Sequence, residues 1–211
     1  MVRCLTQGAR DGKREDTVLA QKHDEVHYRL NERDEIVFVN EAWDAFAARN
    51  SGGHLSSARV LGRPLWDFIT DQATELLYRD VLARIRAGRL VRFVFRCDSA
   101  DCRRRLEMEV SGGPGNGAEF RVRTLSEEAR PPQSLFDPDR PHAEDLLRVC
   151  GWCKKVDVGS HWVEVEEAVS VLGLFERPLL PGVTHGICES CFAEMVATLG
   201  AGEATALGAK N

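Results

Sequence analysis

The sequence contains two Cys-x-x-Cys pairs whose spacing is typical of a metal site. The first pair is Cys150 and Cys153, the second is Cys188 and Cys191, and 34 residues separate them. Two cysteines three positions apart converge from one tight turn on a metal ion, so two such turns supply four sulfurs. Because four thiolates leave no position for a substrate water, the pattern predicts a closed, structural metal site.

Zinc is the expected ion, because a tetrahedral set of thiolates suits it. Iron in a rubredoxin-like site uses the same four sulfurs and stays the alternative. A module of this size buries too little apolar surface to offset its chain entropy, so the metal is expected to supply folding free energy. His185 lies three residues before Cys188. We expect it to hydrogen-bond a thiolate or a backbone carbonyl beside the ligands rather than to replace a cysteine.

A redox-active dithiol is the alternative interpretation of Cys150 and Cys153. Cys-x-x-Cys serves thioredoxin-like enzymes where it opens a helix after a strand. The following residues, Lys154-Lys155-Val156-Asp157, do not predict a helix, and the second pair would be left unexplained. We therefore interpret both pairs as metal ligands and keep a thiol-disulfide redox protein as the alternative.

The elements that must position the cysteines begin with a mixed α+β region. Short strands are predicted at about Val26–Leu30 and Glu35–Val39, followed by a helix that Asn40 caps. Apolar residues at three- and four-residue steps predict a longer helix over Asp71–Ala87. Alternation with a period of two then predicts three antiparallel strands, near residues 91–97, 105–110 and 119–125.

Composition divides the chain into five segments. Charged residues and glycine without apolar periodicity predict a mobile arm at the start, and prolines with many charges predict a linker before the cysteines. The segments are the arm over 1–24, an α+β domain over 25–126, the linker over 127–145, the cysteine module over 146–199 and a flexible tail over 200–211.

The order of elements over 25–126 resembles a PAS domain. The string Phe38-Val39-Asn40-Glu41-Ala42-Trp43 is similar to the second PAS strand entering the first helix, and Leu61-Gly62-Arg63-Pro64-Leu65-Trp66 is similar to the segment before the long helix. Arg96-Cys97-Asp98-Ser99, followed by Arg103-Arg104, is similar to a bacterial PAS subgroup. The resemblance implies a five-stranded antiparallel sheet with flanking helices.

The second half resembles a small cysteine module often found at the C-terminus of bacterial sensor proteins. The resemblance rests on Cys150-Gly151-Trp152-Cys153-Lys154-Lys155, then Trp162 with Glu166-Glu167, then Thr184-His185-Gly186-Ile187-Cys188. Together the two resemblances imply a non-enzymatic sensor or protein-interaction module in bacterial signal transduction. They imply a protein partner and a homodimer formed through the PAS domain, and they do not name the signal.

A PAS fold implies an interior that holds a flavin, a haem or a small metabolite. The alternative is a fully packed core, because aromatic residues and methionine at these periods also build plain cores. The expected lining residues are Phe38, Trp43, Phe46, Trp66, Phe93, Phe95 and Met108. Trp152 and Trp162 are expected to be mainly structural.

Charge disfavours nucleic acid as the partner. The whole chain has a formal charge of −5, and residues 146–199 hold four basic and seven acidic residues. Glu164, Glu166 and Glu167 are expected to be available to a basic protein surface. An arginine-rich region over 79–105 keeps a transcription regulator as an alternative. There we expect Arg92 and Arg96 to pair with Glu107 and Glu109 on the next strand.

The sequence shows neither a catalytic grouping nor an export signal. It has no recognisable Ser-His-Asp set or phosphate-binding loop, so we expect no enzyme activity. It has no apolar run of about 20 residues, and its start is charged, so a cytoplasmic protein is expected. Cys97 and Cys102 flank a predicted turn, where either a reversible disulfide or two free thiols are expected.

Overall fold

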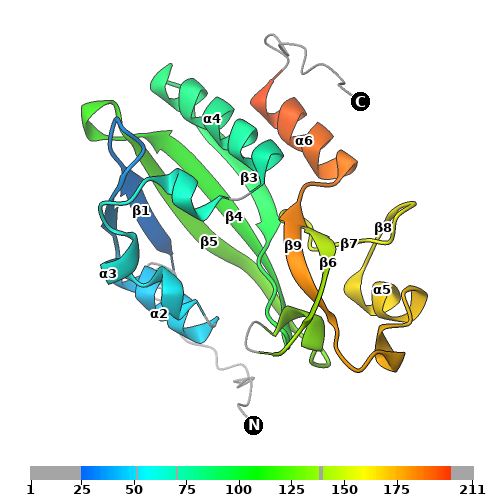
Figure 1. Ribbon diagram of the computed structural model, residues 1–211. Helices are drawn as coiled ribbons and strands as arrows, with labels where there is room; N and C mark the ends of the chain where they lie inside the picture. Colours follow the sequence, from blue (N-terminus) through cyan, green and yellow to red (C-terminus); the bar gives the residue numbers. More distant parts are fainter. Residues whose placement is uncertain (1–24, 51, 70, 138–139, 201–211) are drawn as a thin grey trace, which may run out of the picture.

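The protein is described by a computed structural model over residues 25–50, 52–69, 71–137 and 140–200 (Figure 1). The predicted arm over 1–24 and the predicted tail after Gly200 lie outside these residues. Two sheets with helices around them make up the fold. The elements are, in chain order, β1 Val26–Leu30, β2 Ile36–Val39, α2 Glu41–Arg49, η1 Gly53–Leu55, α3 Ser57–Val60, η2 Leu65–Phe68, α4 Gln72–Arg86, β3 Val91–Arg96, β4 Cys102–Gly112, η3 Pro114–Asn116, β5 Ala118–Ala129, η4 Ser134–Phe136, β6 Ala143–Cys150, β7 Val156–Asp157, β8 Trp162–Val163, α5 Val165–Val171, η5 Leu174–Glu176, β9 Pro181–Gly186 and α6 Glu189–Leu199.

The first sheet has five antiparallel strands in the order β2-β1-β5-β4-β3. Helix α4 covers one face of this sheet with an apolar side that includes Leu77, Val81 and Ile85, all buried. The predicted alternation holds on the strands, because Phe93 and Met108 are buried while Arg92 points outward. The α+β class and the five-stranded antiparallel sheet are therefore confirmed.

Local signals set the ends of the helices as predicted. The Asn40 side chain accepts a hydrogen bond from the Trp43 backbone N–H at 3.2 Å, and this cap begins α2. The Asp71 carboxylate accepts from the Thr74 backbone N–H at 2.8 Å at the start of α4. Helix α4 stops at Gly88, whose φ of +79° is costly for other residues.

The second sheet has the order β8-β7-β6-β9, and its central pair β6 and β9 is parallel. Only the end of β6 is buried, at Val149 and Cys150, whereas Leu146 earlier in the strand is 65% exposed. Val149 lies in an aliphatic core with α5, whereas its neighbour Cys150 lies in the core of the first sheet. Since successive strand residues point to opposite faces, the end of β6 lies between the two cores.

The core of the first sheet continues into the second half of the chain. Trp152, Cys188, Met195 and Leu199 belong to the same buried cluster as the residues of the first sheet. Helix α6 lies beside α4 and β3 (Figure 1). The cysteine turns are therefore packed against the first sheet and not held apart from it.

The segment 127–145, predicted as a linker, is partly built into these elements. Strand β5 runs through Ala129, η4 follows, and β6 begins at Ala143. Leu135 is only 3% exposed and lies in the second core. Prolines end regular pairing in this segment, but they do not prevent a single apolar side chain from docking. Among the described residues, no helix is long and apolar enough to span a membrane.

Candidate metal centre

Two turns from distant parts of the chain hold the four cysteines. Cys150 ends β6, and the turn after it closes through hydrogen bonds from the Lys154 N–H to the Cys150 carbonyl at 3.0 Å and from the Cys150 N–H to the Lys155 carbonyl at 2.8 Å. Lys154 has a φ of +60°. Cys188 follows β9 as the N-cap of α6, and its sulfur accepts from the Cys191 N–H at 3.5 Å.

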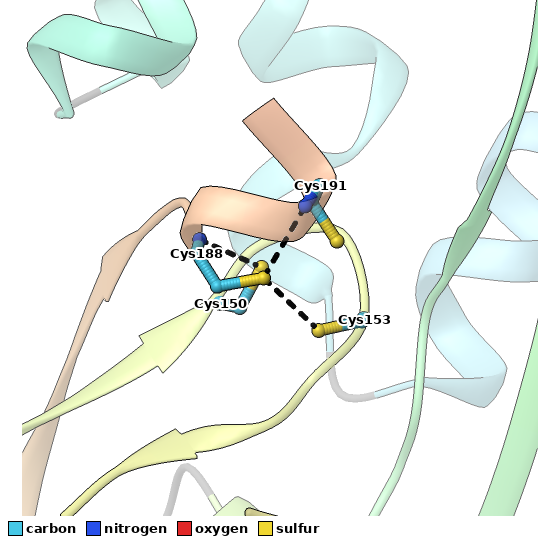
Figure 2. Close-up of side chains that lie close together, drawn as sticks. All are labelled: Cys150, Cys153, Cys188 and Cys191. Carbon is cyan, nitrogen blue, oxygen red and sulfur yellow. Dashed lines mark hydrogen bonds between the residues drawn. The ribbon is translucent and has the colours of Figure 1, made fainter. Parts of the chain in front are cut away.

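The four sulfurs converge on one point (Figure 2). The Sγ atoms of Cys150, Cys153, Cys188 and Cys191 all lie within 4.8 Å of one another. The Sγ atoms of Cys153 and Cys188 are 3.7 Å apart. A tetrahedral zinc with Zn–S bonds of about 2.3 Å places its sulfurs about 3.8 Å apart. The cluster therefore has the ligand type, number and spacing that a four-coordinate thiolate metal site requires.

The centre is buried on its inner side. Cys150 and Cys188 are buried, and Cys153 and Cys191 are half-buried. The Cys188 backbone N–H donates to the Cys150 sulfur at 3.4 Å, and the N-terminus of α6 lies at the cluster. Backbone donors and a helix N-terminus both stabilise negative charge, so they favour thiolates at this position.

The thiols are strongly coupled to one another. Hydrogen bonds from the thiols of Cys153 and Cys191 hold the pKa of Cys150 well below its usual range. The hydrogen bond with Cys150 in turn raises the pKa of Cys153 to about 12 and raises the pKa of Cys191 as well. Four thiols this close do not all ionise unless a cation balances their charge, and a divalent metal supplies it.

His185 lies beside the centre but outside the group of converging ligand atoms. It is on β9 opposite Val149, it is exposed, and it lines two cavities. The hydrogen bond that we predicted from His185 to a thiolate or a carbonyl is not found among the described residues.

Of the seven predicted pocket residues, Phe93 and Phe95 line a cavity of about 370 Å³ beside the first sheet. Trp43 donates to the Leu55 carbonyl at 2.7 Å, and Trp66 donates to Asp34 at 3.2 Å. Trp43, Phe46, Trp66 and Met108 all pack in or against the first core. For these four, the packed-core alternative describes the structure better.

Phe38 is the one predicted pocket residue that faces away from the core. A bulge between β1 and β2 pairs Leu30 with Ile36 but Arg29 with Phe38. The extra residue reverses the alternation, so Phe38 lies on the outer face beside His27. The guanidinium carbon of Arg29 lies over the Phe38 ring, 4.5 Å from the centre of that ring. The prediction for Phe38 was wrong because simple period-two counting does not reveal a bulge.

Sequence reasoning missed the cavity residues that come from other elements. The cavity is also lined by Tyr28, Leu65, Phe68, Ile69, Asp71, Thr74, Tyr78, Gly151, Trp152 and His185. Trp152 was expected to be structural, and it is indeed buried at 7% exposure against Phe93 and Tyr78. Its position in the first Cys-x-x-Cys pair was a signal that it lies near the metal, but not that it lines a cavity.

A network of charges joins the two sheets. The Asp98 carboxylate is fully buried and pairs with Arg96 and with Arg130, whose Nη1 is 3.3 Å away. Arg96 also donates to both oxygens of Glu164 at 3.0 and 2.8 Å, and Arg103 donates to Glu166 at 2.9 Å. Burial alone would lower the pKa of Arg96, but its hydrogen bonds with the carboxylates raise it.

These pairs correct two predictions. Arg92 does pair with Glu109, as expected, but Arg96 sits opposite Arg105 and pairs with Asp98 and Glu164 instead. Glu164 and Glu166 are therefore paired with arginines of the same chain and are not free for a basic partner. The sequence could not show this, because the partners are more than 60 residues apart and meet only when the sheets pack.

The other two cysteines of the described residues behave as ordinary thiols. Both Cys97 and Cys102 are free and half-buried, and Cys97 packs against the first core. Burial raises the pKa of Cys102, which makes it a poorer nucleophile. The interpretation as two free thiols is the one that these observations favour.

No protein-family model matches the sequence, and no curated protein matches it either.

Proposed function

We propose that this protein is a non-enzymatic sensor or protein-interaction module of bacterial signal transduction, whose PAS-like region is supported by a structural four-cysteine zinc site. The observation that carries the proposal is that the cysteine turn is part of the core of the first sheet. Trp152, between the two ligands of the first pair, is buried against Phe93, and its carbonyl accepts from the Arg96 N–H at 2.6 Å. A metal bound at the turn would thereby also stabilise the first sheet, which belongs to the proposed sensor region.

The PAS-like assignment is supported by the order of the elements. Two strands, short helices, the long helix α4 and three strands form one antiparallel sheet, which is the order on which the resemblance rests. A cavity of about 370 Å³ next to this sheet provides room for a small ligand. These features favour a sensor over a plain structural domain.

Zinc is the proposed metal and iron the alternative. The donor set consists of four thiol sulfurs, which suits both ions. Two of the cysteines are buried, and the set offers no carboxylate or open ligand position within it. A structural role therefore fits this donor set better than a catalytic one.

The proposed partner is a protein, and the proposed assembly is a homodimer through the PAS-like sheet in the cytoplasm. Nucleic acid is disfavoured because many arginines of the 79–105 region already have acidic neighbours, among them Arg92 with Glu109 and Arg104 with Glu127. Exposed charge left for phosphate contacts is correspondingly reduced.

The test is metal and thiol analysis of the purified protein. We expect about one zinc per chain and four thiols that react only after a chelator is added. Absorbance in the visible range would identify iron instead. A metal-free protein with four freely reactive thiols would contradict the proposal.

A thiol-disulfide redox protein is the second candidate. The sequence analysis placed its dithiol at Cys150 and Cys153, but one specific observation favours the other pair. Cys188 and Cys191 open helix α6 directly after strand β9, which is the context that redox-active Cys-x-x-Cys pairs use. The same experiment separates the two functions. A redox protein would show two reactive thiols of lowered pKa and a disulfide that forms reversibly in a glutathione buffer.

A further inference from the structure

Strand β9 forms one edge of the second sheet, because the order β8-β7-β6-β9 gives it a single neighbour. In a parallel pair, every second residue directs its backbone N–H and C=O groups at the neighbouring strand, and the residues between direct theirs away. The Gly151 N–H donates to the Gly186 carbonyl at 2.8 Å, so Gly186 directs its backbone groups at β6. Thr184 does the same, and Val183 and His185 therefore direct theirs at the open edge.

The first part of this edge is covered from within the molecule. The Pro181 carbonyl points to the edge by the same alternation, and it accepts from the Arg140 guanidinium at 2.6 Å. The backbone groups of Val183 and His185 have no such partner among the described residues. Open strand edges are templates for pairing with another chain, and proteins usually protect them. Two outward residues of β9 are therefore free to pair with an added strand.

Both residues can be reached by a ligand. His185 is exposed, Val183 is half-buried, and both line a second cavity of about 370 Å³. Figure 1 shows β9 on the side of the second sheet that is turned toward the first, and the cavity is also lined by Asp98 and by Leu135 and Phe136 of η4. Because these residues bound the cavity, the edge has room for a single extended segment but not for the edge of another sheet.

The charges of this cavity indicate one side chain of such a segment. Lys154 lines the cavity and has no ion pair among the described residues. Its Nζ donates to one backbone carbonyl at 3.0 Å, which leaves two donors. The Asp98 carboxylate is already paired with two arginines, and the other charged residues of the wall, Asp137 and Arg140, have opposite signs. An acidic side chain therefore complements Lys154.

We infer that β9 is a docking site for an extended segment of a partner protein. The segment adds to the sheet as a strand beside Val183 and His185, and an acidic side chain of the segment meets Lys154. Recognition by strand addition takes its affinity from backbone hydrogen bonds and its specificity from pockets for alternate side chains. The inference names a class of partner for the proposed protein-interaction function, and it rests on that function.

The open edge is tested by amide hydrogen exchange of the metal-loaded full chain, followed by NMR. After correction for intrinsic rates, we expect the amides of Val183 and His185 to exchange at least about tenfold faster than that of Thr184, because only the Thr184 N–H is bonded to β6. Equal protection of all three amides would overturn the inference.

Binding is tested with linear decapeptides displayed on phage and selected on the metal-loaded full chain. We expect enriched peptides that share an aspartate or a glutamate and that slow the exchange of the Val183 and His185 amides. A strand docked on one edge bonds through alternate residues. N-methylation of one alternate set of peptide nitrogens should therefore weaken binding at least about tenfold, and methylation of the other set should not. No enrichment, or equal tolerance of both sets, would overturn the proposal.

Two substitutions at one position separate the backbone from the side chain. His185→Pro removes the outward N–H without removing a bond to β6, whereas His185→Ala loses the same side chain and keeps the N–H. We expect at least about tenfold weaker peptide binding in His185→Pro and nearly unchanged binding in His185→Ala. Equal affinities of the two variants would contradict the docked strand.

Lys154→Gln tests the expected acidic side chain. It should weaken binding of the selected peptides about two- to fivefold, because a partly exposed ion pair contributes little more. Unchanged affinity in this variant would refute the assigned role of Lys154.

Metal content is measured for every variant. Should His185→Pro not retain its metal, the amide exchange and the N-methylated peptides decide the question. Protection of the Val183 and His185 amides that rises with protein concentration would show that a second copy occupies the edge, which contradicts the inference. A metal-loaded protein that binds no peptide refutes the docking site alone, whereas a protein that holds no metal refutes the proposed function itself.

Discussion

The two sheets of this protein differ in what holds them together. The first sheet has a large core with aromatic residues such as Tyr28, Phe93 and Phe120, and Tyr28 stacks on Phe120 with ring centres 4.4 Å apart. The second core contains eight buried residues, all aliphatic: Leu135, Val149, Val156, Val163, Val165, Ala168, Val169 and Leu174. Apolar burial scales with the area removed from water, so the first region can stabilise itself and the second needs added cross-links.

The second region obtains those cross-links in two ways. A metal held by the four cysteines would tie β6 and its turn to α6, and the charges around Asp98 tie α5 to the first sheet. The side chains of Trp152, Met195 and Leu199 also pack in the first core. The comparison teaches that a small region can be ordered by its neighbour as much as by its own core, and that the convergent cysteines offer a further cross-link once they bind a metal.

Removal of the metal should have the largest effect on the order of the second region. In Cys188→Ser, or with a strong chelator, we expect loss of the metal and of amide protection across β6–β9 and α6, because metal-binding free energies of small zinc units are about 10–16 kcal/mol. Hydrogen exchange followed by mass spectrometry measures the effect. Protection in β3 and α4 should fall only partly, since their own core remains.

Cys102→Ser is the matched control, because Cys102 is half-buried and outside the cluster. It should leave metal content and exchange unchanged. Equal loss of protection in both sheets on chelation would show that they form one cooperative unit and that the comparison is wrong.

Trp152→Ala should have the next largest effect. The substitution leaves a cavity between Phe93, Tyr78 and the metal turn, and large-to-small changes of this kind cost about 3–5 kcal/mol. We expect a lower midpoint of denaturant unfolding for each of the two sheets, because Trp152 packs where they meet. Trp162→Ala, at a half-buried tryptophan under Arg148, should cost clearly less. A larger loss of stability in Trp162→Ala than in Trp152→Ala would show that Trp162 provides the main contact between the two sheets.

Asp98→Asn tests the buried end of the charge network. The variant keeps the shape but leaves Arg96 and Arg130 without their shared carboxylate, and hydrogen bonds to charged groups are worth about 1.5–3 kcal/mol. Chemical denaturation should show a loss of this size. Asp101→Asn, at an exposed residue of the same turn, should change the free energy of unfolding little.

Glu164→Gln tests the outer end of the same network. Glu164 is partly exposed, so the loss of its pairing with Arg96 should cost about 0.2–1 kcal/mol and shrink with added salt. Glu167→Gln is the control, because Glu167 is exposed and has no ion pair among the described residues. A salt-independent loss would point to packing and not to charge.

The smallest effect should come from His27 on the outer face of the first sheet. Burial lowers the pKa of His27, against the opposing pull of Glu119 at 3.0 Å. With a folded pKa below the unfolded value, the unfolded chain binds more protons in acid, so this group reduces stability as the pH falls through about 6.5. His27→Gln should flatten that part of the stability profile. An unchanged profile would mean that His27 has the same pKa in the folded and the unfolded chain.

Elements with local causes could be predicted from the sequence. Asn40 and Asp71 cap their helices, Gly88 ends α4, and the alternation from Val91 gives β3, because each of these signals acts within a few residues. The convergence of the four cysteines could also be predicted, since the i, i+3 spacing already implies two convergent turns.

Phe38, Arg96 and the cavity could not be predicted in the same way. One extra residue in β2 turned Phe38 outward, and no pattern in the sequence marks a bulge. Arg96 had acidic candidates on the adjacent strand, but the register placed Arg105 opposite it and the second sheet supplied Glu164. Register and long-range partners depend on how the sheets pack, which involves groups far apart in the chain.

The sequence by itself determined the cysteine ligands, the helix ends and the α+β class, because these follow from short-range spacing and periodicity. The tertiary structure alone decided that the cysteine turn is built into the first core and that Trp152 closes a cavity there. It also decided that Glu164 and Glu166 pair with arginines of the first sheet. The physical reason is that burial and charge pairing are properties of surfaces brought together, and those surfaces exist only once the chain has folded.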